Sequence, residues 1–382
     1  MIAQRELPLR LALGYVLQIT KGYASREAAE TFTRARALGE QMTDTRRVFY
    51  LLQALFATTL SQGEVRAAQE LADQLLYVAE RDGTPAMLTW AHWAQAATRY
   101  ARGEPATALT HAERALSHYR MEDHRRTLMD PGLIALGTAG QAAWQLGFPG
   151  QALRRARELL DLGQRLTGLV HVAVSLEWAA MIEAQVGELD RALEHAERGR
   201  QLIAEQQLPY HSAWGDVIAG RLYALRGRYA EGIARLHDGL RVAAATGTRL
   251  ARGLFLGYLA EAQLVAGVVA DGLATIEDAL AAVPDEQMHL PELLRLRGEL
   301  RAAAGADAAA VEESYREAMA LARRLGAKMQ ELRATSSLGR FLRTHGRAAE
   351  ARELLAPIYA SFTEGFDTRD LIEAKALLEE LG

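Results

Sequence analysis

Residues 103–119 read GEPATALTHAERALSHY, and this stretch decides the fold. Its alanines Ala108, Ala112 and Ala115 lie at positions i, i+4 and i+7, which form one face of a helix. A glycine stands at the start of the stretch, where it favours a turn before the helix. The same arrangement returns after Gly187 in GELDRALEHAERGRQL. The stretch is therefore predicted to be one unit of a repeat.

The glycine of this unit recurs about every forty residues along almost the whole chain. The series is Gly22, Gly63, Gly103, Gly147, Gly187, Gly227, Gly267, Gly305 and Gly346. Small residues accompany most of these glycines, five positions after and seven positions before; Phe56 breaks the second rule. Repeat one is shifted by a residue, with Ala28, Phe32 and Ala35, and so is repeat eight, with Val311, Tyr315 and Ala318. A fixed period with this spacing is typical of tetratricopeptide repeats, in which two antiparallel helices pack closely and turn at the glycine.

The fold class that follows is all-α. We expect residues 1–382 to form a single α-solenoid of about nine tetratricopeptide-like helix pairs, wound as a right-handed superhelix. The period of about 40 exceeds the standard 34, so the helices should be longer by about a turn. No segment alternates with period two, so no sheet is expected. Residues 366–382 carry Leu371, Ala374 and Leu377 at helical spacing and are predicted to form a capping helix over the last repeat.

Composition excludes several classes of function. The formal net charge of −4 gives no general attraction to nucleic acid or anionic lipid. The chain has no cysteine, which excludes disulfides, thiolate catalysis and cysteine zinc sites. Residues 1–10 lack the apolar segment of a signal peptide, and no apolar run approaches the roughly 20 residues that span a bilayer. We expect a cytoplasmic protein without nucleic-acid or membrane partners.

Catalytic motifs are also absent. No G-x-x-x-x-G-K-[ST] or G-x-G-x-x-G motif occurs, so neither phosphate cradle is present. Neighbouring carboxylates such as Glu312 and Glu313 diverge by about 100° on a helix and cannot form an acid–base pair. His118 and His124 have no third residue to complete a metal site. We expect a non-catalytic protein with no metal and no cofactor.

Three blocks of sequence carry a family resemblance. They are LALGYVLQITKGYASREAAETFTRARAL at 11–38, DPGLIALGTAGQAAWQLGFPGQAL at 130–153, and a C-terminal block that comprises ELLRLRGELRAAAG at 292–305 and residues 314–381, which end in FTEGFDTRDLIEAKALLEEL. They resemble the tetratricopeptide tail of bacterial predicted-ATPase regulators, in which a class III nucleotidyl cyclase or kinase module often precedes a STAND-type ATPase. The wider resemblance is to the sensor solenoids of maltose-activator-like STAND proteins. It implies a signalling or transcription-regulatory role, with upstream ATPase or cyclase modules as partners.

Candidate binding residues follow from the repeat register. In tetratricopeptide arrays, positions 13, 10, 6 and 3 before the linker glycine face the concave groove. Here these positions hold Trp90, Trp93, Tyr100, Gln141, Trp144, Glu177, Trp214 and Arg221. Grouped exposed aromatic side chains are common binding anchors, so we expect this groove to bind a peptide or partner protein. The alternative is that the longer helices shift the register and bury the indole rings between repeats.

Arginines occupy the same positions in the last repeat. Arg333, Arg340 and Arg343 would take a carboxylate or an acidic peptide end, or would form a solvated face paired with nearby acids.

A second candidate is the segment HYRMEDHRRTLMDPG at 118–132, where the glycine spacing widens. In one interpretation His124, Arg125, Arg126 and Asp130 form a lip that contacts a ligand over the groove. In the other, the segment is a solvated inter-repeat loop.

Two functions remain open at this point. A peptide-binding sensor or scaffold should show an open groove with a polar rim. A small-molecule effector receptor should show an enclosed aromatic pocket of a few hundred Å3 at the centre of the superhelix.

Overall fold

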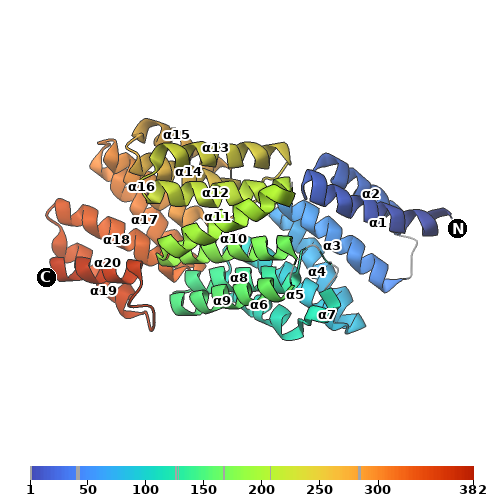
Figure 1. Ribbon diagram of the computed structural model, residues 1–382. Helices are drawn as coiled ribbons and strands as arrows, with labels where there is room; N and C mark the ends of the chain where they lie inside the picture. Colours follow the sequence, from blue (N-terminus) through green and yellow to red (C-terminus); the bar gives the residue numbers. More distant parts are fainter. Residues whose placement is uncertain are drawn as a thin grey trace.

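The computed structural model describes residues 2–39, 44–124, 127, 129–166, 168–206, 208–282 and 285–382. All regular secondary structure in these ranges is helical, as expected, with twenty helices and no strand. The helices are wound into an elongated body that has α1 and α2 at one end and α19 and α20 at the other (Figure 1).

Within the described ranges, nine antiparallel helix pairs follow one another. The pairs are α1 (Ile2–Lys21) with α2 (Arg26–Gly39), α3 (Thr45–Ser61) with α4 (Val65–Asp82), α5 (Pro85–Ala101) with α6 (Pro105–His118), α8 (Pro131–Gln145) with α9 (Pro149–Leu166), α10 (Leu169–Val186) with α11 (Leu189–Gln206), α12 (Pro209–Leu225) with α13 (Tyr229–Ala245), α14 (Arg252–Val265) with α15 (Val269–Ala281), α16 (Leu290–Ala303) with α17 (Ala308–Leu325), and α18 (Lys328–Thr344) with α19 (Ala348–Ala360). The short α7 (Met121–His124) follows the third pair, and α20 (Arg369–Glu380) follows the ninth.

The periodic glycines lie at the turns inside the pairs. All nine have a positive φ, from 68° at Gly305 to 104° at Gly22. L-residues with a side chain are strained in this region and glycine is not, so the chain reverses there at little cost. The turn prediction is confirmed.

Small residues bring paired helices close together. A Cβ atom added at Gly232 on α13 would lie 2.6 Å from the carbonyl oxygen of Gly220 on α12. The shift in repeat eight is also confirmed, because Val311, Tyr315 and Ala318 are buried. The two helices of a pair therefore pack where the repeat pattern indicates.

Successive turns of the superhelix touch each other. The carbonyl oxygen of Ser61 accepts hydrogen bonds from the backbone N–H groups of Arg249 (2.9 Å) and Leu250 (3.2 Å). The carbonyl oxygen of Ala101 accepts one from Gln287 N–H at 2.8 Å. These partners lie between four and five repeats apart. The inner helices of one turn therefore enclose a narrow space, in place of the wide groove expected from the sequence.

Two further helices have clear roles in the packing. Leu371, Ala374 and Leu377 of α20 are buried against the last repeat, which confirms the cap. Among the described helices, α10 alone is long and apolar enough to cross a membrane, but 72% of it is buried inside the solenoid. Such burial is typical of a core helix.

Candidate functional site

The predicted aromatic groove is wrong for two of its four tryptophans. Trp90 and Trp144 are only 5% and 3% exposed. Trp93 and Trp214 are half-buried and pack edge-on against aromatic rings, with Phe255 4.7 Å from Trp214 between ring centroids. All four indoles pack against neighbouring helices, and only Trp93 and Trp214 keep part of their surface exposed. They are therefore not a set of exposed anchors.

The polar members of the predicted set do not meet at one place. The Tyr100 hydroxyl donates to Gln141 Oε1 at 2.8 Å in the interior. Glu177 is buried elsewhere, with its Oε2 3.5 Å from His211 Nδ1, and burial raises the pKa of its carboxyl group. Of the eight predicted groove residues, only Arg221 lines the polar cavity described below.

The predicted lip is wrong for His124 and Asp130, and Arg125 and Arg126 lie outside the described residues. His124 is buried, with its ring stacked on Tyr119 at 5.5 Å between centroids. Asp130 is fully buried and is the N-cap of α8: its Oδ1 accepts the Gly132 N–H at 2.9 Å, and its Oδ2 accepts the Tyr119 hydroxyl at 3.0 Å. Burial raises the pKa of Asp130 and lowers that of His124. These side chains hold the loop against α8, so they do not face a ligand.

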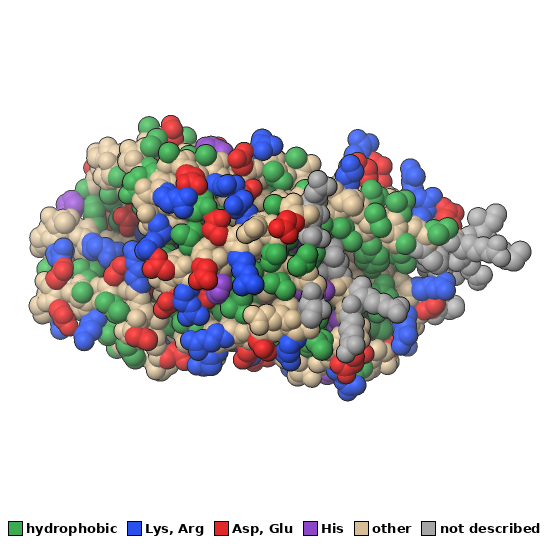
Figure 2. Space-filling view, in the orientation of Figure 1, with side chains coloured by type: hydrophobic (Ala, Val, Ile, Leu, Met, Phe, Trp, Pro, Cys, Tyr) green, Lys and Arg blue, Asp and Glu red, His purple; other side chains and the backbone are tan. Residues whose placement is uncertain are grey.

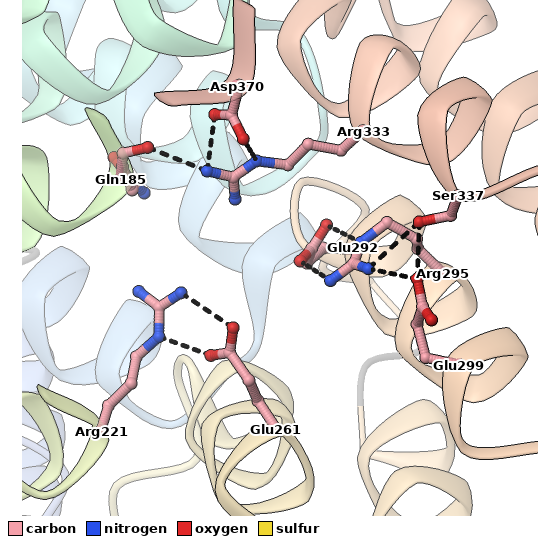
Figure 3. Close-up of polar contacts among 9 residues, drawn as sticks. All are labelled: Gln185, Arg221, Glu261, Glu292, Arg295, Glu299, Arg333, Ser337 and Asp370. Carbon is pink, nitrogen blue, oxygen red and sulfur yellow. Dashed lines mark hydrogen bonds and ion pairs between the residues drawn. The ribbon is translucent and has the colours of Figure 1, made fainter. Parts of the chain in front are cut away.

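A polar cavity lies at the centre of the C-terminal half of the solenoid. Its volume is about 160 Å3, and α10, α12, α14, α16, α18 and α20 contribute to its walls. Its charged lining consists of five arginines and four carboxylates, namely Arg221, Arg295, Arg333, Arg340, Arg369, Glu261, Glu292, Asp370 and Glu373. We call this cavity the central channel. Figure 3 shows the guanidinium groups of Arg221, Arg295 and Arg333 directed toward a common space.

Arg221 and Glu261 join two neighbouring inner helices. The Arg221 Nε donates to Glu261 Oε2 at 2.7 Å, and the guanidinium carbon lies 4.3 Å from the centre of the Tyr258 ring. Burial works against the charged form of Arg221, but the Glu261 carboxylate outweighs it and raises the pKa of the guanidinium. The arginine therefore stays charged in the interior.

All three nitrogen atoms of the Arg295 guanidinium donate hydrogen bonds. Its Nε and Nη2 donate to the two Glu292 oxygens at 3.0 and 2.7 Å, and its Nη1 donates to Glu299 at 3.1 Å (Figure 3). The Ser337 hydroxyl also donates to Glu299 at 2.7 Å. Burial opposes ionisation of Glu292, but Arg295 lowers the pKa of this carboxyl group overall. This fork-to-fork geometry fixes the position of the guanidinium.

Arg333 joins two turns of the superhelix. It donates to both Asp370 oxygens, at 2.9 and 2.8 Å, and to the backbone carbonyl oxygen of Gln185 at 2.9 Å. Its guanidinium carbon lies 4.7 Å from the centre of the Trp144 ring. One side chain thus connects the fifth repeat, the ninth repeat and the capping helix.

The repeat register applied to later repeats would have found several of these residues. Glu261 and Glu299 stand six positions before their linker glycines, like Arg221. Arg295 stands ten positions before its glycine, and Glu292 thirteen. The sequence reasoning missed them because it favoured the aromatic side chains of the middle repeats. Asp370 follows no repeat position, and only the packing of α20 brings it to the channel.

Other kinds of site receive no support from the described residues. No group of three or more His, Asp or Glu side chains in the described ranges is placed to hold a metal ion. The described residues that line the central channel include no aromatic side chain. On the outer face drawn in Figure 2, positive and negative side chains are interspersed, without a large area of one sign.

Comparisons with known proteins confirm the fold. No protein-family model matches the chain, and no curated protein matches it. A Rap protein complexed with competence and sporulation factor aligns over 99% of this chain and 97% of its own, with a TM-score of 0.56 and 13% identity. The Rap conjugation gene regulator of plasmid pLS20, in complex with the Phr* peptide, aligns over 98% and 95%, with a TM-score of 0.55 and 9% identity.

A third similar structure is that of a hetero-tetramer of Cut9 and Hcn1. The Cut9–Hcn1 complex aligns over 93% of this chain and 72% of its own, with a TM-score of 0.58 and 12% identity. At these identities the likeness concerns the fold alone. The chain is thus a tetratricopeptide-like helical repeat solenoid.

Proposed function

We propose that this chain is a non-catalytic sensor solenoid that binds a peptide, or the end of a partner protein, in the central channel. The observation that carries the proposal is the lining of the channel, where charged side chains from five helices converge. Stability alone is a poor reason for so many buried charges, because replacing a buried ion pair by apolar side chains is often neutral or stabilising. A ligand with polar groups of its own would form hydrogen bonds and ion pairs with these charged side chains.

The chemistry of the lining favours a peptide. Both signs of charge are present, and hydroxyl and amide groups of Ser336, Ser337 and Gln185 lie among them. A peptide end offers a charge, N–H donors and carbonyl acceptors together. The two Rap structures with bound factors have the same fold over nearly the whole chain, and they support this choice by analogy of fold.

The wider system follows from the family resemblance of the sequence. We place the chain in the cytoplasm, where its binding event would control upstream ATPase or cyclase modules. A ligand does so by binding one conformation of the regulator more tightly than the other.

The alternative function, a receptor for a small effector with an aromatic pocket, agrees with a narrow space in place of an open groove, but the size and the lining of the cavity support it less well. Pockets for drug-sized ligands usually measure about 300–1,000 Å3 and are mostly apolar. The central channel is smaller, at about 160 Å3, and its described lining is charged.

The test is selection of peptides followed by mapping. A library of random heptapeptides with free C-termini is selected on the purified chain, and hydrogen–deuterium exchange is measured with and without the best peptides. We expect slower exchange in α10, α18 and α20, and no change in the outer helices α4 and α6. Failure to select any peptide with a Kd below about 100 μM, or protection confined to outer helices, contradicts the proposal.

A further inference from the structure

The arginines of the central channel fall into two groups. Arg221, Arg295 and Arg333 each share two hydrogen bonds with a carboxylate from another position of the array or from the same helix. Arg340 makes no hydrogen bond or ion pair with any described residue, although it lines the same cavity. Among the described residues Arg369 pairs only with Glu373 on its own helix, and both side chains are about half exposed.

This difference leaves positive charge available at one part of the cavity wall. Exposed pairs within one helix are weak, so Arg369 exchanges its partner easily. Arg340 has no partner among the described residues to give up. Glu299, which holds Arg295, balances the one arginine by which the lining exceeds its carboxylates, so the charge available to an anion is local, at Arg340 and Arg369.

One more group of this wall lacks a partner among the described residues. Ser336 precedes Arg340 by one helical turn on α18, so both lie on the same face, and its hydroxyl bonds to no described residue. Ser336 is only 5% exposed, and a polar group buried without a partner is unfavourable, so an anion that accepts a hydrogen bond from this hydroxyl would be favourable.

We propose that this wall binds the free C-terminal carboxylate of the peptide, with Arg340 and Ser336 as donors to the carboxylate. The inference rests on the proposed function and names the part of the ligand that the channel recognises. A C-terminal residue carries an anion, which matches the donors of this wall. Arginine suits this role because its planar fork binds a carboxylate through two parallel hydrogen bonds.

The size of the cavity agrees with a chain end. A water molecule occupies about 30 Å3, so the 160 Å3 volume corresponds to about five waters. A chain terminus fits this space, whereas a folded partner domain does not. The rest of the ligand would then continue outward past Arg369.

The experiment compares each selected heptapeptide as free acid and as C-terminal amide. Binding is measured by isothermal titration calorimetry to the wild-type chain, to Arg340→Gln and Arg340→Lys, and to the control Arg343→Gln. Arg343 lies on the same helix but pairs with Glu380 and does not line the cavity. Arg340 is exposed and has no ion-pair partner in the part of the chain that the structure describes, so its variants should keep the wild-type melting temperature.

We expect amidation to weaken binding to the wild type about tenfold, which is the size of one hydrogen bond to a charged group. Arg340→Gln should weaken the free acid equally and leave the amide unchanged, Arg340→Lys should lie between, and Arg343→Gln should match the wild type. Equal binding of acid and amide, or an amide that remains sensitive to Arg340→Gln, overturns the inference while the proposed function stands. If the amide remains sensitive to Arg340→Gln, the arginine binds an acidic side chain of the peptide and not its C-terminal carboxylate. Absence of binding by both forms overturns the proposed function and this inference with it.

Discussion

Replacing the buried carboxylate of Glu286 by glutamine should stabilise the protein above pH 7. Glu286 lies in the loop between α15 and α16 and is 6% exposed. Its two oxygens share the backbone N–H of Ala251, at 3.2 and 3.1 Å, and no cation of the described residues contributes to its environment. Burial therefore raises its pKa from the usual 4.5 to about 7, and the Ala251 N–H only partly opposes this rise.

The sign and the size of the effect follow from these two pKa values. Between pH 4.5 and 7 the folded protein keeps a proton that the unfolded chain has released, so stability falls as the pH rises through this window. At about 1.4 kcal/mol per pH unit, the loss reaches about 3 kcal/mol at pH 8 and is under about 1 kcal/mol at pH 5. Glutamine stays neutral, and its side-chain oxygen can still accept the Ala251 N–H.

The assay is urea denaturation of the wild type and Glu286→Gln at pH 5, 6, 7 and 8, followed by far-UV circular dichroism. Exchange of the Ala251 amide gives a local measure, because a repeat array can open locally. Glu353→Gln, an exposed substitution on α19, is the control for the loss of a negative charge. The reasoning is refuted if the stability difference does not grow with pH, or if Glu286→Gln is the less stable protein at pH 8.

Three other experiments test the packing. Asp130→Ala removes the cap of α8 and the acceptor of the Tyr119 hydroxyl, so thermal denaturation should show a loss of about 2–4 kcal/mol; a loss below about 1 kcal/mol would contradict the buried cap. Gly232→Val should destabilise by about 3 kcal/mol or more in urea, because its side chain would meet the facing backbone; wild-type stability would mean that the two helices lie further apart. Arg333→Met combined with Asp370→Asn in a double-mutant cycle should give a coupling of about 1–3 kcal/mol, and additive effects would argue against the ion pair between the last repeat and the capping helix.

Part of the candidate site could be predicted from the sequence. The position six residues before the linker glycine holds Arg221, Glu261 and Arg340, and all three line the central channel. The choice of tryptophans failed because aromatic character was taken as a sign of binding, whereas Trp90 and Trp144 are large enough to fill the contacts between close-packed helices. The role of Asp130 was also available, since an aspartate before a proline at the first helical position is a common helix start.

The sequence by itself determined the repeat, the helix pairs and their turns. Each of these depends on residues close together in the chain, such as a glycine with positive φ or a small residue that lets two adjacent helices approach. Only the tertiary structure decided which inner faces are buried and which line the channel. That outcome depends on the pitch of the superhelix, which is the sum of small rotations between successive repeats. The pitch decides which residues of distant repeats meet, such as Ser61 with Arg249 and Arg333 with Gln185. No local pattern encodes such a sum: the repeat register placed Arg340 at an inward-facing position, but only the assembled turns show that it lines a narrow channel without a partner among the described residues.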